Sequence, residues 1–325
     1  MIDAKVSFMN QMSQELSGVL TVDQMEKMNR AGYAILDRFD VIELTDQDEA
    51  SDDLLESYVA AMKVECRSQK TIDRYVYEIR RLMEFTKVPT RRISKYHLRA
   101  YLSAEQDRGI CENTLEGHRQ IFSAYFNWLQ RESLIEKNPC VNVGVIKVPK
   151  KEKKIFTEEE LERLNRCCVN KRDRAILHFL RSTGCRISEV TELNRDAVNT
   201  EMMECVVHGK GNKERTVYLD GVARMVLEEY LKDRKDDDPA LFVNRYKKRI
   251  EPGGVREMLQ KLAVKADVEH VHPHKFRRTL ATELVRHGMP IQEVAKILGH
   301  EKLDTTMKYV VLNKEDIKAS YRRYA

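Results

Sequence analysis

The stretch from His272 to Tyr309 gathers residue types that phosphoryl transfer requires. His274 and Arg277 are three residues apart, so on a helix they share one face. His300 directly follows a glycine, and Tyr309 comes soon after it. Arginines gathered beside a tyrosine predict a phenolate nucleophile that attacks a phosphate, whose charge the guanidinium groups stabilise.

Three short helices are expected to position these side chains. The first covers residues 274–287, with its leucines and valine on one side, and a glycine and a proline then end it. The second covers 291–298 and stops at a glycine, the residue that commonly ends a helix. The third is expected over 305–311 and carries Tyr309.

An upstream segment, Thr183–Glu189, adds a further arginine. A helix is expected to end at Gly184, and Ser188 can begin another, which places Arg186 at a helix junction. An arginine held there can bind a phosphate through two parallel hydrogen bonds. Glu189 follows Arg186 by three residues and can pair with it.

Two short alternating segments, 204–208 and 215–219, predict a β-hairpin. The residues between them, Gly209–Lys213, form a glycine-rich turn. Such a tip can present the ammonium group of Lys210 to a ligand, with Lys213 as the second choice. The run does not match a nucleotide-binding loop, because the Walker pattern is absent and no helix follows.

Together these segments resemble the sequence boxes of the tyrosine recombinases, the phage-integrase family. Thr183–Glu189 resembles the first arginine box, Pro273–Arg277 resembles the H-x-x-R box, and Leu298–His300 with Tyr309 resembles the last. The resemblance covers roughly residues 54–325 and is stronger in the second half. One departure is Arg278, which stands where many members have a second histidine.

The resemblance implies a role for each polar residue. Tyr309 would form a 3′-phosphotyrosyl bond, and His274 would assist the proton transfer. Arg186 and Arg277 would hold the nonbridging oxygens. The full catalytic set implied by the resemblance, followed by its supporting residue, is Arg186, Lys210, His274, Arg277, His300, Tyr309 and Glu189. His300 would donate a hydrogen bond to the phosphate, and Lys210 would protonate the leaving 5′-oxygen.

The same resemblance implies the partners of the protein. The substrate would be double-stranded DNA at specific recombination sites, and about four protomers would assemble on two sites. No metal, ATP or other cofactor would be required, because the covalent link conserves the phosphodiester energy. A short amphipathic patch in the tail 313–325 would pack either on its own domain or on a neighbouring protomer.

Composition and charge agree with a DNA-binding protein. The chain has 325 residues, enough for about two domains, and 34% of them are charged. Residues 1–50 carry ten Asp or Glu and four Lys or Arg, a net charge of −6, which leaves +11 for the rest of a +5 chain. A basic body favours an anionic partner. No membrane span and no signal-peptide pattern is found, and seven cysteines without a CxxC pair indicate reduced thiols, so a cytoplasmic protein is expected.

The expected fold is mainly α with a small β-sheet. Residues 1–53 form an acidic helical extension ending in a hinge at 46–53, and 54–145 form a helical core-binding domain of SAM-like type. A basic linker covers 146–154. Residues 155–325 form the mixed α/β catalytic domain with its C-terminal tail. The linker lysines would cross a phosphate backbone and add salt-dependent affinity.

Two other functions are consistent with parts of the sequence. The three alternating histidines of 270–274 suggest zinc, but no cysteine or carboxylate set stands at ligand spacing beside them. Residues 279–300 resemble a helix-turn-helix, which would make the chain a non-catalytic DNA-binding regulator. That alternative leaves Arg186, Lys210 and Tyr309 without a role.

Overall fold

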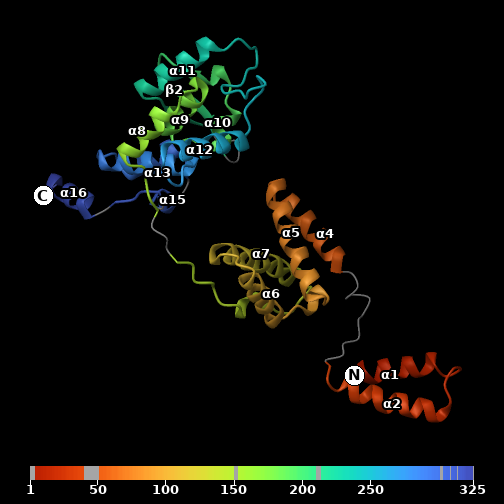
Figure 1. Ribbon diagram of the computed structural model, residues 1–325. Coiled ribbons are helices and arrows are strands. Elements are labelled where there is room, and N and C mark those ends of the chain that lie inside the picture. Colours follow the sequence, from red (N-terminus) through yellow and green to blue (C-terminus); the bar gives the residue numbers. More distant parts are fainter. Residues whose placement is uncertain are drawn as a thin grey trace. The chain divides into compact units, whose positions relative to one another are not determined.

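In a computed structural model the chain divides into two compact units, Met1–Lys150 and Lys151–Ala325 (Figure 1). The structure describes residues 4–39, 51–149, 153–209, 214–300, 303–307, 309–312 and 314–324. The two units are described separately below.

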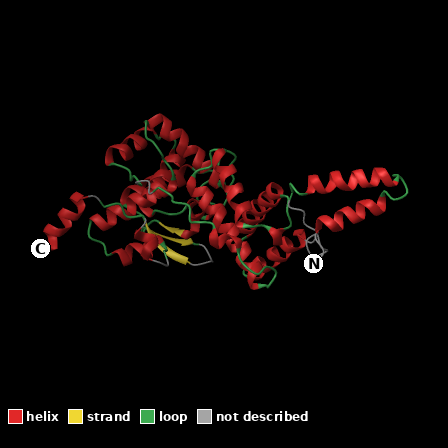
Figure 2. Ribbon diagram, turned by 90° about the horizontal axis from the view of Figure 1, so that it is seen from below, coloured by secondary structure: helices red, strands yellow, loops and turns green. Residues whose placement is uncertain are grey.

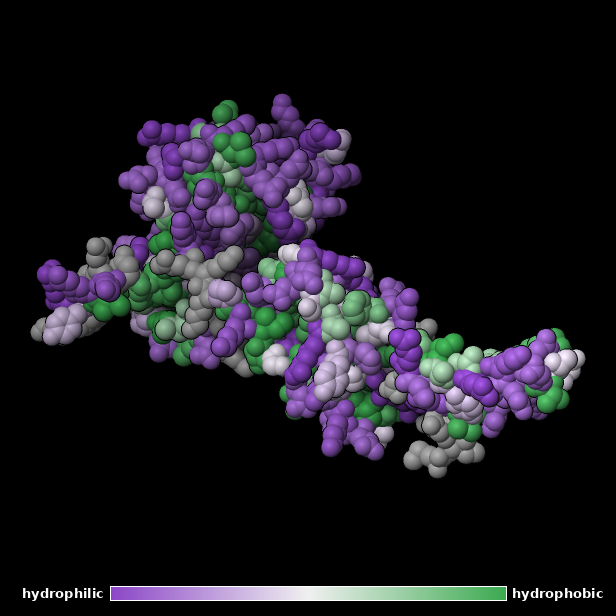
Figure 3. All heavy atoms as spheres, turned by 60° about the horizontal axis from the view of Figure 1, so that its bottom comes forward, coloured by the Kyte–Doolittle hydropathy of each residue, from purple (hydrophilic) through white to green (hydrophobic). Residues whose placement is uncertain are grey.

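The first unit begins with a helical hairpin, α1 (Ala4–Glu15) and α2 (Val22–Leu36). Thr21 starts α2 through a reciprocal capping box with Gln24, so the expected helical extension contains a turn between two helices. The two helices approach closely at Gly32, where a Cβ atom would lie 2.6 Å from Met9 Cε. Met9 is the one fully buried apolar residue of the described hairpin, and other apolar side chains remain at its surface (Figure 3).

A four-helix bundle forms the rest of this unit. Its helices are α4 (Ser51–Val64), α5 (Gln69–Thr86), α6 (Lys95–Asp107) and α7 (Glu112–Arg131), with 3₁₀ turns at Thr90–Arg92 and Pro139–Asn142. Their apolar faces form one core, rich in aromatic residues that include Tyr58, Phe122 and Trp128. The aromatic residues of this core are therefore packing residues rather than exposed platforms for stacking bases.

The hinge was expected over residues 46–53, but its last three residues are helical. Helix α4 already begins at Ser51, and residues 46–50 lie outside the described residues. The apolar residues Leu54 and Leu55 are both buried in the bundle core, and this burial stabilises the first turn of α4 although acidic residues precede it.

In the second unit a small sheet lies at one side of a larger group of helices (Figure 2). It begins with α8 (Glu158–Cys167), α9 (Lys171–Thr183) and α10 (Ile187–Glu192), followed by a 3₁₀ turn at Arg195–Ala197. The sheet has the antiparallel order β1 (Val198–Asn199), β2 (Glu204–His208) and β3 (Glu214–Tyr218), with Val206 opposite Thr216. The expected hairpin is confirmed, and β1 adds a strand that the short segment 198–199 did not suggest.

The remaining helices complete this unit. They are α11 (Gly221–Asp233), α12 (Pro252–Ala266), α13 (Pro273–Arg286), α14 (Ile291–Leu298), α15 (Leu303–Met307) and α16 (Lys314–Tyr324). Helix α9 is largely buried, and both α11 and α13 pack against it. The expectation of a mainly helical protein with a small sheet is confirmed.

One local expectation in the second unit is wrong. The third site helix was expected over 305–311, but α15 ends at Met307, so Tyr309 lies just beyond it. The segment after α15 contacts Thr282 through hydrogen bonds, and local periodicity does not reveal a partner so far away in the chain.

All seven cysteines are free thiols. None of the helices in the described part of the chain is long and apolar enough to cross a membrane.

A buried carboxylate holds α5 and α6 of the bundle together. Glu105 is 1% exposed and accepts two hydrogen bonds of 2.8 Å from Arg81 and a third from Arg108. We expect Arg81→Met to lower the free energy of unfolding by about 2–3 kcal/mol, because it removes two charge-assisted bonds from a buried anion.

The bundle contains the only tryptophan of the chain, Trp128, so urea unfolding followed by its fluorescence reports on this unit. The matched control is Arg67→Met, which removes an exposed ion pair with Glu65 and should cost at most about 0.5 kcal/mol. Equal effects of the two substitutions would contradict the prediction.

Candidate active site

Helix α13 carries two of the predicted site residues on one face. His272 starts the helix by accepting the backbone N–H of Lys275 at its Nδ1 (3.2 Å), and Pro273 occupies the first position, where no N–H is needed. His274 and Arg277 then lie three residues apart within the first turns. The predicted helical spacing of this pair is thus present in the structure.

Arg277 is a buried cation without an anionic partner among the described residues. It is 1% exposed, and it donates to the carbonyls of Gly184 (2.8 Å) and Leu298 and to Nε2 of His300 (3.0 Å). Its Nε has no hydrogen-bond partner there. Burial, and then repulsion by Arg186 and Arg215, lower the pKa of Arg277 to about 10. The surroundings of Arg277 therefore favour the arrival of an anion.

Arg186 is held by Glu189, as the sequence predicted. Arg186 precedes α10, and its backbone N–H donates to Glu189 Oε2 while its Nη1 donates to Oε1, both at 2.7 Å. Its side chain remains one-third exposed, at 33%. With one guanidinium nitrogen bonded to Glu189, the rest of the group is available to a phosphate.

Arg215 is a site residue that the sequence analysis missed. It lies on β3 and donates from Nη1 and Nη2 to the two oxygens of Glu189 (2.8 and 2.7 Å). Burial raises the pKa of Glu189, but the hydrogen bonds from Arg215 and from the backbone of Arg186 outweigh it, and the pKa falls to about 2. The available signal was the alternation of the strand, which places Arg215 on the same inward face as buried Val217.

His300 follows the left-handed residue Gly299, which ends α14. Its Nδ1 lies 2.9 Å from Thr306 Oγ1, and its Nε2 accepts from Arg277, which can only donate. Burial and the charges of Arg277 and Arg186 lower the pKa of His300 to about 4. The ring is therefore neutral at pH 7, with its proton on Nδ1.

Tyr309 lies over the buried arginine. Its ring centroid is 5.7 Å from Arg277 Cζ and 5.1 Å from the ring of His300, and its hydroxyl is 3.3 Å from His274 Nδ1. Burial, and then Arg277 and Arg186, lower the pKa of His274, so its ring is neutral at pH 7 and can accept the phenolic proton.

The backbone of Tyr309 is anchored although no helix carries it. Its N–H donates to the carbonyl of Thr306 (2.8 Å), and the hydroxyl of Thr282 lies 3.5 Å from its carbonyl. The same hydroxyl accepts the N–H of Val311 (3.1 Å). These contacts attach the segment to α13 and to the end of α15.

The structure brings together most of the predicted set. The residues that meet are Arg186, Glu189, His274, Arg277, His300 and Tyr309. Lys210 and its second choice, Lys213, lie outside the described residues. Arg278 donates from its Nη1 to the carbonyl of Lys154 at the start of the second unit (2.7 Å).

Two of the three histidines of 270–274 have other contacts in the structure. No group of three or more potential ligands that could hold a metal occurs among the residues that the structure describes. His272 instead caps α13, and His274 contacts Tyr309.

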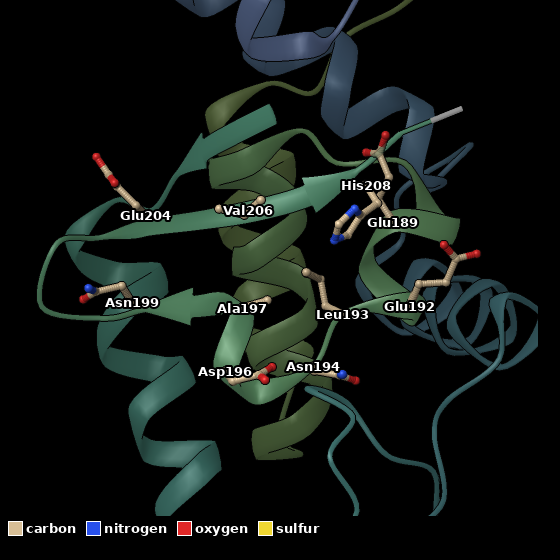
Figure 4. Close-up of a pocket in the computed structure, with 10 residues that line it drawn as sticks. All are labelled: Glu189, Glu192, Leu193, Asn194, Asp196, Ala197, Asn199, Glu204, Val206 and His208. Carbon is tan, nitrogen blue, oxygen red and sulfur yellow. The ribbon is translucent and has the colours of Figure 1, made fainter. Parts of the chain in front are cut away.

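Glu189 also lines an acidic cavity of about 580 Å³ (Figure 4). Other carboxylates in its wall are Glu192, Asp196 and Glu204, and His208 lies near Glu189. Negative charge repels a phosphate. The arginine cluster, rather than this cavity, is the place where a phosphate would bind.

Comparisons with known proteins match both units. The phage integrase family model matches residues 154–316, and the model for the phage integrase N-terminal SAM-like domain matches 54–136. The tyrosine recombinase XerC of Bacillus subtilis is 30% identical over 272 residues, which cover 78% of this chain and 90% of that protein. The XerC of Bacillus pumilus is 30% identical over 273 residues, with the same coverage.

Solved structures share the fold at low sequence identity. A lambda integrase tetramer bound to a Holliday junction has a TM-score of 0.71 at 14% identity, covering 90% of this chain and 87% of that one. The Tn1549 transposon integrase bound to transposon right end DNA has a TM-score of 0.69 at 17% identity, covering 83% and 98%.

The match to the family model, the 30% identity to the XerC proteins and the grouping of arginine, histidine and tyrosine side chains indicate the same family. The chain belongs to the phage integrase family, the tyrosine recombinases, which are enzymes that transfer DNA strands.

Proposed function

We propose that this protein is a site-specific recombinase that cleaves and rejoins duplex DNA through a 3′-phosphotyrosyl intermediate. The observation that carries the proposal is the position of Tyr309. Its hydroxyl contacts a neutral histidine, and its ring lies over Arg277, a buried cation with no anionic partner among the described residues. A scissile phosphate would supply the missing anion.

The first chemical step follows from these contacts. The phenolic oxygen of Tyr309 attacks phosphorus while His274 accepts its proton, and the bond from phosphorus to the 5′-oxygen breaks. Arg186 and Arg277 stabilise the charge that develops on the nonbridging oxygens. Lys210 is proposed to protonate the departing 5′-oxygen. A 5′-hydroxyl from another duplex then reverses the step and leaves the strands exchanged.

His300 must change partners to act as the resemblance implies. At present its Nε2 accepts from Arg277, so it has no proton to give a phosphate from that atom. Donation requires a proton on Nε2, and the contact with Arg277 must then open. Binding of a phosphate to Arg277 provides the reason for that contact to break, because a charged acceptor is stronger than an imidazole nitrogen.

The chemistry that we propose needs neither ATP nor a metal ion. The phosphotyrosyl bond retains the energy of the phosphodiester that was broken, so rejoining requires no external source. The arginines supply the positive charge that a metal would otherwise provide. We propose that the protein works in the cytoplasm on DNA there, as a tetramer assembled on two sites.

The non-catalytic regulator with a helix-turn-helix is not favoured. In a helix-turn-helix protein the second helix is the recognition helix and lies in the major groove. Here that helix would be α14, and the alternative gives no role to Tyr309, whose ring lies over Arg277 and whose hydroxyl contacts His274 on α13. α13 therefore builds a reaction site.

The nucleophile is tested with a suicide DNA substrate that carries the protein's own site and a nick near the scissile phosphate. We expect the wild type, in EDTA, to give a protein–DNA band that survives a denaturing gel and vanishes on proteolysis. Tyr309→Phe should bind the same DNA and give no band, because it lacks the nucleophilic oxygen. A band from Tyr309→Phe, or no band from wild type on bound DNA, would exclude the proposal.

The pH dependence tests His274 as the proton acceptor. The ordinary pKa of histidine is about 6.5. Since burial and Arg277 lower the pKa of His274, the base stays active as pH falls through 6.5 and is lost only in more acidic solution. The second-order rate of covalent-complex formation at sub-saturating DNA should show this, because it reports the free enzyme. A decline centred at or above pH 6.5, with DNA binding unchanged, would argue against the assignment.

The tail is expected to serve assembly. Arg286 on α13 pairs with Asp316 on α16 (2.9 Å), so the last helix is tied to the helix that carries the site. Deleting residues 314–325 should impair pairing of two DNA sites more than binding of one, as measured by gel shift and by recombination of two labelled duplexes. Arg286→Gln, which removes only the ion pair, is the control with a smaller effect. Recombination at the wild-type rate after the deletion would reject this role.

A further inference from the structure

Arg215 has all three guanidinium nitrogens bonded within the protein. Two donate to the oxygens of Glu189, and Nε donates to the carbonyl of Ile297 (2.9 Å) near the end of α14. Its side chain is 10% exposed. With every nitrogen engaged and little surface exposed, Arg215 is placed to hold other groups rather than a phosphate.

Gly299 makes room for this arginine. A Cβ atom at Gly299 would lie 2.8 Å from Arg215 Cδ and 3.2 Å from its Nε. The residue also has a φ of +64°, a conformation that side chains disfavour. The glycine before His300 therefore both ends α14 and allows the Arg215 side chain to reach Ile297.

Glu189 depends on both arginines. Each of its oxygens accepts one bond from Arg186 and one from Arg215, and the residue is 3% exposed. A buried carboxylate that loses half of its donors is costly, so it moves or takes up a proton. Either change would release the Arg186 guanidinium from its present orientation.

We propose that Arg215 is a positioning residue of the strand-transfer site: it fixes Glu189 so that Arg186 is aimed at the phosphate, and it ties that pair to the end of α14 that carries His300. The proposal rests on the proposed recombinase function. In this proposal Arg215 acts through Arg186 and the segment of His300, which contact the phosphate, and it takes no part in protonating the leaving 5′-oxygen.

Arg215→Lys tests this role because it keeps the positive charge and removes the planar guanidinium with its several N–H donors. One ammonium cannot bond both oxygens of Glu189 and the carbonyl of Ile297 in the geometry that a planar guanidinium provides. We expect single-turnover cleavage of the suicide substrate to fall by about 100-fold, the loss typical of a small misplacement of a catalytic group. Affinity for the DNA should stay within about threefold of wild type, because Arg215 does not contact phosphate.

Arg249→Lys is the matched control. Arg249 donates to the carbonyls of Thr191 and Leu193 and to the side chain of Asn194, at the end of α10 and just beyond it, and no hydrogen bond to Glu189 is found. It should lower the melting temperature of the protein as Arg215→Lys does. Cleavage per folded molecule should change by no more than about twofold, as expected for a site outside the coupled cluster.

A substrate with sulfur in place of the bridging 5′-oxygen distinguishes a loss of leaving-group protonation from a loss of phosphate positioning. A thiolate leaves without a general acid, so this substrate should restore cleavage by Lys210→Ala. It should not restore cleavage by Arg215→Lys. Restoration in Arg215→Lys, or wild-type cleavage of the normal substrate by that variant, would overturn the proposal.

The coupling to Glu189 gives a second, independent test. Glu189→Gln keeps the shape of the side chain, and we expect it to lose cleavage to a similar extent. The double variant should be little worse than either single one, because both act on the same interaction. If the loss of cleavage in the double variant equals the product of the two single losses, the proposal is overturned. Wild-type cleavage by Glu189→Gln would also overturn it, even if Arg215→Lys failed to fold.

The experiments distinguish a failure of the proposed recombinase function from a failure of the proposed role of Arg215. If wild type forms no covalent complex on bound DNA, the recombinase assignment fails and Arg215 has no site to position. If wild type forms the complex and Tyr309→Phe does not, the function stands, and the variants of Arg215 and Glu189 alone decide the present proposal.

Discussion

The second unit depends on the burial of one carboxylate, that of Glu189. Removing an ionised carboxylate from water is expensive unless hydrogen bonds replace those of the solvent. Arg186 and Arg215 provide four such bonds, and the pKa of Glu189 falls to about 2 in spite of its burial. The start of α10 and strand β3 are thereby fixed to one another, and Ile297 adds the end of α14 through Arg215.

Arg277, in contrast to Glu189, is a buried charge without an oppositely charged partner among the described residues. It is as deeply buried as Glu189, but its acceptors are two backbone carbonyls and a neutral histidine. Its lowered pKa reflects burial and the repulsion of two neighbouring arginines. A structure normally avoids such an uncompensated charge. The cost is consistent with a site built for an anionic substrate, because a phosphate removes the imbalance only when it binds.

Tyr309, the proposed nucleophile, lies beyond the end of a helix rather than on one. Arg186 and Arg277 are fixed by α10 and α13, whereas Tyr309 lies beyond α15 and is held through Thr282 and Thr306. Its ring lies over Arg277. Hydrogen bonds to Thr282 and Thr306 thus hold the proposed nucleophile, whereas hydrogen bonds to Glu189 and to backbone carbonyls hold the arginines.

The sequence by itself determined the elements whose signals are local. The helix break after residue 287, the left-handed Gly299 and the shared face of His274 and Arg277 each follow from spacing or from a single residue type. The resemblance to the family boxes also predicted Arg186 and Tyr309 as site residues. Tertiary structure decided the rest, because those features depend on partners far away in the chain. Arg215 meets Glu189 across 26 residues, Arg277 meets Gly184 across 93, and α15 stops before Tyr309, whose segment bonds to Thr282. Local periodicity carries no information about such pairs, since their energies exist only once the helices and the sheet have packed together.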